Sequence, residues 1–144
     1  MAQVLTSLIA VAGTLLGGCL GYILQHHAGN RAERRAAVLA YTAAITEFIR
    51  AQQDWWWRKD EQPDGPAHKA ARLEGQRLRG MARQAVNGML FSVGDAELVA
   101  EARQILDDAN TVHRAADRTE MSARAAAVRA SLDRFIQHAA QRVR

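Results

Sequence analysis

Few residues of this chain have the types and spacing that catalysis or metal binding requires. None of the histidines has a known metal-ligand spacing to another; they are His26, His27, His68, His113 and His138. Cys19 is the single cysteine, so it has no second thiol to work with. The chain has no nucleophile elbow, zinc-protease helix, phosphate-binding loop or dinucleotide fingerprint. The sequence therefore predicts no catalytic residue, no metal site and no cofactor.

Positive charge after Pro66 is the chemistry that the sequence offers instead. Helical spacing places four basic residues near one face, namely Lys69, Arg72, Arg79 and Arg83. Such a face can bind anionic lipid headgroups or nucleic-acid phosphates. It can also pair with the segment 95–117, which has six acidic and two basic residues. We expect this pairing, and nucleic-acid binding is not favoured because no DNA-binding motif accompanies the face.

The consecutive tryptophans Trp55, Trp56 and Trp57 are the second candidate site. Successive helix positions differ by about 100°, so the three rings cannot all face one core. We expect at least one to be exposed as a protein contact. The alternative is that two close the end of a bundle and the third is half-covered. Arg58 and Lys59 are placed to stack on an indole face.

The segment Val4–Leu24 contains no charged side chain, and the first charge in the chain is Arg31. As a helix it is about 32 Å long, enough to cross the hydrocarbon core of a bilayer. Arg31, Arg34 and Arg35 follow it, and basic flanks stay on the cytoplasmic side. We expect a single-pass protein of the cell membrane with its N-terminus outside and its body in the cytoplasm.

Two other interpretations of this segment remain open. A cleaved secretory signal needs a basic start and a shorter apolar stretch than this one. An exported lipoprotein is suggested by Leu16-Gly17-Gly18-Cys19, although Leu20–Leu24 stays apolar after the cysteine. The mass of the processed N-terminus distinguishes these two from an uncleaved anchor.

Small residues in this segment are arranged in register. Gly13, Gly17 and Gly21 are spaced four apart, and Ala10, Thr14 and Gly18 form a second ridge beside them. Membrane helices associate through close backbone approach, which such glycines allow. Glycine is also common in membrane helices in general. We expect the ladder to make the protein a homo-oligomer.

Beyond residue 30 apolar residues recur at three- and four-residue steps in four segments. The first stripe, ending before Pro63, is Val38, Tyr41, Ile45, Phe48, Gln52 and Trp55. A second helix over about 67–91 has the stripe Leu78, Met81, Ala85 and Met89. The third stripe is Leu98, Ala102, Ile105, Ala109, Val112 and Ala116. The fourth is Met121, Ala125, Val128, Leu132, Phe135, Ala139 and Val143.

The predicted fold is all-α, with an anchor over residues 1–30 and an antiparallel bundle of about four helices over residues 31–144. Residues 92–95 form a turn with Asp95 as the N-cap of the third helix, and Thr119 or Ser122 caps the fourth. The short connections make neighbouring helices antiparallel. Gly29-Asn30 either breaks the first helix or lies within one continuous rod.

Several stretches of this sequence resemble the KilB-type proteins of actinomycete conjugative plasmids and their chromosomal relatives. They are residues 7–17, the Arg/Glu/Ala-rich helix that follows, Ala40-Tyr41-Thr42-Ala43 and Arg50-Ala51-Gln52. The resemblance covers mainly the first 60 residues. It implies a membrane-associated accessory in plasmid transfer or in spread within the mycelium, with transfer machinery as its partner.

The sequence as a whole predicts a non-enzymatic membrane protein that self-associates and docks an unidentified protein partner. The runner-up is a membrane-tethered module that binds nucleic acid or anionic lipid through the second helix.

Overall fold

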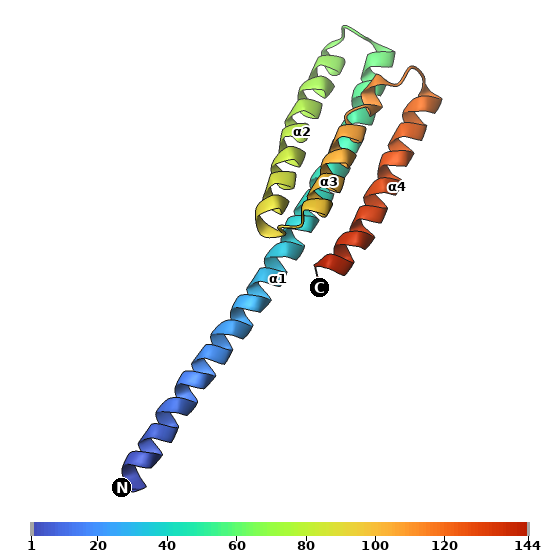
Figure 1. The fold of residues 1–144 in the computed structure, drawn as a ribbon. Helices are drawn as coiled ribbons and strands as arrows, with labels where there is room; N and C mark the ends of the chain where they lie inside the picture. The colour runs from blue at the N-terminus through green and yellow to red at the C-terminus, as the bar shows by residue number, and fades with distance from the viewer. Residues whose placement is uncertain (1, 144) are drawn as a thin grey trace. The chain divides into compact units, whose positions relative to one another are not determined.

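The computed structural model describes the backbone of residues 2–143 and the side chains of residues 29–143 (Figure 1). Its helices are α1 (Ala2–Glu61), α2 (Pro66–Ser92), α3 (Ala96–Ala109), the 3-10 helix η1 (Val112–Arg114) and α4 (Arg118–Arg142). No strand occurs in residues 2–143. The predicted all-α class and helical bundle are therefore confirmed.

The chain divides into two units, residues 1–33 and 34–144, and each is described by itself. The side chains of the apolar segment, the glycine ladder and Cys19 lie outside the described residues. Among the side chains that are described, no helix is long and apolar enough to cross a membrane. Gly29 and Asn30 are helical, so α1 has no break at the predicted position.

The second unit is an up-down-up-down bundle in which each helix runs opposite to the one before it (Figure 1). α2 begins at Pro66, whose fixed φ suits the first turn of a helix. Gly94 has φ 67°, a left-handed conformation that glycine adopts without strain. Asp95 caps α3 as predicted, because its side chain accepts from the backbone N–H of Glu97 and Leu98.

The start of α4 differs from the prediction of Thr119 or Ser122 as its cap. Asp117 is the N-cap, and its carboxylate accepts from the backbone N–H of Glu120 at 2.8 Å. The Glu120 carboxylate reaches back to the N–H of Ala116 at 2.6 Å. This exchange satisfies two backbone donors at once, which a lone hydroxyl cap does not achieve.

Buried apolar residues from α1, α2, α3 and α4 form the core, with large side chains such as Phe48 and Phe135 beside alanines such as Ala102. Tyr41, Ile45 and Phe48 are fully buried, and the Tyr41 ring meets Phe135 edge-on with centroids 5.1 Å apart. The Tyr41 hydroxyl donates to the carbonyl of Ala102 at 2.9 Å, and burial raises its pKa above the usual value. All seven residues of the stripe predicted for the fourth helix are buried.

The stripe predicted for the second helix is partly wrong. Met81 is 48% exposed and Ala85 is half-buried, whereas Ala82 and Val86 are buried. Helical steps place Leu78, Ala82, Val86 and Met89 within about 80° of one another and put Met81 about 60° outside that arc. The angle around the axis, rather than the size of the side chain, decides which residue packs inside.

The third helix is also shorter than predicted. It ends at Ala109, and η1 turns the chain so that Val112 is buried while Ala116 is exposed. The tighter turn of η1 brings His113 to Gln52 of α1, where it lines a hollow.

Candidate anion-binding groove

The three tryptophans all pack against the second unit itself. Trp56 is 6% exposed, and its Nε1 donates to the carbonyl of Ala115 at 2.9 Å. Trp57 is half-buried, meets Trp56 edge-on, and has the Arg118 guanidinium 5.1 Å from its ring centre.

Trp55 is half-buried as well, so the expectation of at least one exposed ring was wrong. Each indole ring packs against a different neighbour, so the three rings are covered without facing one common core. The predicted stacking of Arg58 on an indole face is also wrong, because Arg58 pairs with Asp54 and Glu61. Whether Trp55, Trp56 or Trp57 contacts a partner stays a prediction.

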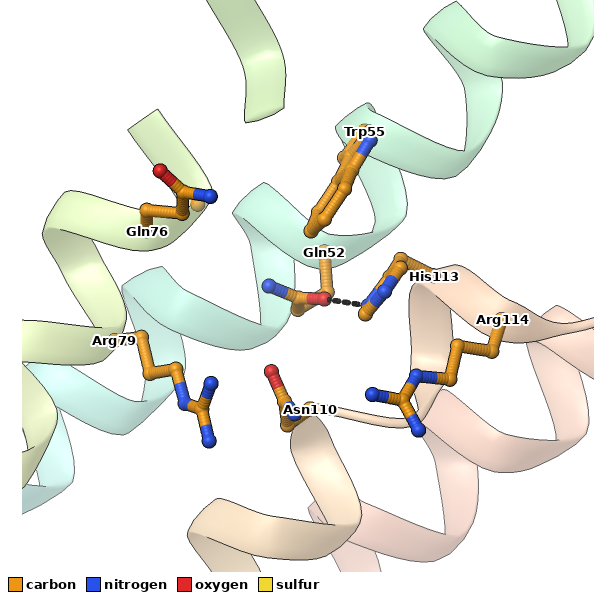
Figure 2. A pocket seen from close by; sticks show the side chains of 8 residues that line it. Gln52, Trp55, Gln76, Arg79, Asn110, His113 and Arg114 are labelled. Atoms are coloured by element: carbon orange, nitrogen blue, oxygen red, sulfur yellow. Dashed lines mark hydrogen bonds between the residues drawn. The ribbon is translucent and has the colours of Figure 1, made fainter. Parts of the chain in front are cut away.

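Trp55 lies at the centre of a groove between α1, α2 and η1. Its ring stacks on His113 with centroids 3.9 Å apart and planes 5° apart, and its Nε1 donates to Nε2 of His68 at 3.0 Å. Two adjoining hollows of about 140 and 440 Å³ make up the groove, and both are lined by Trp55, Gln76, His113 and Arg114. Figure 2 shows the smaller one, with side chains from three helical segments turned toward a common space.

The groove is lined by four cations and by no carboxylate. The cations are Lys59, Arg72, Arg79 and Arg114. Within the described residues, none of them lies within ion-pair distance of an acidic side chain. Like charges gathered without a counter-charge repel one another, so this arrangement is electrostatically unfavourable by itself.

The predicted pairing of the basic second helix with the acidic third is therefore not found among the described residues. The acidic α3 pairs instead with the end of α4, where Arg142 contacts Asp95 at 2.9 Å and Glu97 at 2.6 Å. His138 adds a 2.9 Å contact with Glu101 along the same seam.

The buried amide of Gln52 forms part of the floor of the groove. Gln52 is only 1% exposed, and its Oε1 lies 2.6 Å from Nδ1 of His113 (Figure 2). Because an amide oxygen only accepts, Nδ1 must carry the proton and donate. Burial, together with the nearby charges of Arg114, Lys59 and Arg79, lowers the pKa of His113 to about 4. The imidazole is therefore neutral at neutral pH.

This depressed pKa predicts an acid-sensitive contribution to stability. Below pH 6.5 the His113 imidazole is protonated in the unfolded chain. In the folded chain it stays neutral until the pH falls to about 4. The contribution of His113 is therefore complete above pH 6.5 and is lost as the pH falls toward 4. We expect His113→Asn, which keeps a donor near Gln52, to unfold in urea with a shallower loss of stability between pH 7 and 5. Parallel curves for the two proteins would contradict this assignment.

The structure separates the four basic residues that the sequence placed on one face. Arg72 and Arg79 line the groove, whereas Arg83 lines another hollow that also contains Asp107. Lys69 is exposed and lines none of these hollows.

Sequence reasoning missed Gln52, His113 and Arg114 as groove residues and assigned Lys59 to a different contact. Their spacing along the chain does not predict that they meet, because Gln52 lies in α1 and the other two lie in η1, about 60 residues later. Elsewhere in the described residues, no group of three or more histidine, cysteine or acidic side chains is placed to hold a metal ion.

Fold and site together define a small helical-bundle protein with one basic, polar-floored groove at the end where α1 meets α2 and η1. A comparison with protein families matches residues 35–143 to the family described as KilB plasmid transfer protein. The match spans the whole bundle, and the chain belongs to this family. The resemblance noted in the sequence is thereby confirmed, although the match covers the bundle rather than the first 60 residues. Comparisons with curated proteins and with solved structures gave no match.

Proposed function

We propose that this protein is a non-enzymatic accessory of plasmid transfer that is anchored in the cell membrane, self-associates and docks another component of the transfer machinery. The observation that carries the proposal is the family match over residues 35–143. The four cations of the groove, which have no acidic partner within the described residues, suit the binding of another component.

Membrane anchoring is supported by the sequence of the N-terminal segment. Val4–Leu24 is free of charge and lies in the helix Ala2–Glu61. The positive residues Arg31, Arg34 and Arg35 follow it directly, which favours an external N-terminus and a cytoplasmic bundle.

Self-association is supported by the glycine register and by the composition of the bundle. Gly13, Gly17 and Gly21 repeat at one-turn spacing, which allows two helices to approach closely. Part of the core consists of alanines from α2, α3 and α4, and each of these buries little apolar area. Association gives such a bundle additional stability in proportion to the protein concentration.

The test compares two isoleucine substitutions on opposite sides of the N-terminal helix. Gly17→Ile blocks the ladder, whereas Ala12→Ile adds similar bulk about 140° away. We expect Gly17→Ile to reduce crosslinked oligomers in membranes about tenfold, as a loss of about 1.4 kcal/mol in association would do. Plasmid transfer frequency should fall with it, and Ala12→Ile should keep both near the original level.

Three results would refute parts of this proposal separately. An unchanged oligomer distribution in Gly17→Ile shows that the glycines do not assemble the protein. Recovery of the original protein in the soluble fraction removes the anchor. Normal transfer after deletion of the gene removes the accessory role.

A second candidate function is the binding of phosphate-bearing molecules through α2. The observation that favours it is the absence of acidic partners around Arg72 and Arg79 in the described residues. Binding of the full chain to DNA and to anionic vesicles across a salt series tests it, because phosphate contacts weaken steeply as salt rises.

A further inference from the structure

The unbalanced charge of the groove indicates a ligand that is not part of the chain. Several arginines elsewhere in the bundle have acidic partners, such as Arg77 with Glu74 and Arg124 with Glu120. Around Trp55, two adjoining hollows are lined by cations and by no carboxylate of the described residues. Arg79 lines the smaller hollow, Lys59 and Arg72 line the larger one, and Arg114 lines both. A bound anion would supply the missing counter-charge.

The polar floor suits an anion with several oxygen acceptors. Arginine guanidinium groups offer paired N–H donors that match phosphate oxygens. Arg79, Gln76 and Asn110 approach the smaller hollow from α2 and from the end of α3 (Figure 2). Gln52 turns its oxygen to His113 and its amide nitrogen to the other side, where it can donate.

The dimensions favour a small ligand over a flat macromolecular contact. The larger hollow, about 440 Å³, lies within the usual range of small-molecule sites. The indole of Trp55 is not free for a stacked nucleobase, because His113 covers it on one side. A Cβ at Gly75 would lie 3.4 Å from ring atom Cε3, so α2 also contacts the ring. Single-strand binding usually needs an open aromatic face.

We propose that the groove around Trp55 and His113 binds a small soluble anion of the diphosphate class, either pyrophosphate or the phosphate groups of a nucleoside polyphosphate. Arg72, Arg79, Arg114 and Lys59 balance its charge, and the amides at the floor donate to its oxygens. This inference does not depend on anchoring or self-association, so either can fail without the other.

The test uses the full chain in an uncharged maltoside detergent and measures binding of pyrophosphate by calorimetry. The double variant Arg72→Gln/Arg79→Gln removes two groove cations. Lys69→Gln/Arg83→Gln removes the same charge from the same helix but outside the groove. We expect the first to weaken pyrophosphate binding at least tenfold and the second to weaken it less than threefold. Equal losses would show only a general attraction by the net positive charge, and the groove would be refuted.

A second readout follows the imidazole of His113 by NMR across pH. Pyrophosphate should raise its pKa from the depressed value, because a bound anion offsets the neighbouring cations. An unchanged titration with saturating pyrophosphate places the anion elsewhere and overturns the proposal.

Competition identifies the source of the phosphate. Short single-stranded DNA and vesicles containing phosphatidylglycerol are each added with pyrophosphate present. The proposal is supported if pyrophosphate displaces bound DNA or vesicles and binds the protein more tightly than either of them does. DNA or vesicles that bind through Arg72 and Arg79 while pyrophosphate does not compete would overturn the assignment to a small anion.

Discussion

Phe135→Ala is expected to reduce the free energy of unfolding by about 3–5 kcal/mol, the usual range for removing a fully buried aromatic ring. Phe135 is 0% exposed, and its ring lies edge-on against Tyr41 with centroids 5.1 Å apart. Removing it opens a void beside the ring of Tyr41, whose hydroxyl joins α1 to the carbonyl of Ala102. Because Tyr41 joins α1 to both α3 and α4, weakening its contacts reduces the stability of the whole bundle.

The matched control is Phe91→Ala, the same chemical change on an exposed ring. Phe91 is 86% exposed in the last turn of α2, and its removal should change stability by less than about 0.5 kcal/mol. Urea unfolding followed by circular dichroism, with full chains in detergent, measures both. A loss under about 1 kcal/mol for Phe135→Ala would show that the bundle repacks around the gap.

Trp56→Ala should have an effect of similar size, about 3–5 kcal/mol. The ring is 6% exposed, and its Nε1 donates to the carbonyl of Ala115 at the junction of η1 and α4. This bond holds the end of α1 to the connection that also carries His113. We therefore expect the variant to lose the stacking of Trp55 on His113 as well as overall stability.

Two further variants separate packing from hydrogen bonding at this site. Trp56→Phe keeps most of the buried ring and removes the donor, so its cost should be nearer 1–2 kcal/mol. Trp57→Ala removes a half-buried ring and should cost less than Trp56→Ala. Thermal unfolding ranks the three variants, and a Trp57→Ala variant as unstable as Trp56→Ala would contradict the assignment of Trp56 as the buried ring.

Features written in a single helix were predictable. The stripe ending in Val143 repeats at three- and four-residue steps on one side of α4, and all of it is buried. The turn before Asp95 and the end of α1 before Pro63 are marked by residues with strong conformational preferences. Periodicity also identified Gln52 as core-facing, although a buried amide has no apolar signal of its own.

Errors arose where two helices compete for the same space. Spacing of three and four residues places Met81 on the predicted stripe, but the inward angle of α2 is occupied by Ala82, which is buried while Met81 is 48% exposed. Ala116 was assigned to α3 because the apolar period continues past Ala109, although η1 interrupts the helix. At least one ring of Trp55–Trp57 was expected to be exposed because a single helix has only one inward face. In the bundle these rings are covered from α2, η1 and α4.

Taken alone, the sequence determined the helical class, the turns and the inward sides of α1 and α4, since these depend on residues close along the chain. Only the tertiary structure decided which charges meet. Arg72 and Arg79 separate from Lys69 and Arg83, and Lys59 and Arg114 join them around His113. The physical reason is that periodicity gives a direction around one helix axis, while a groove depends on the register and the turns that set several helices against one another.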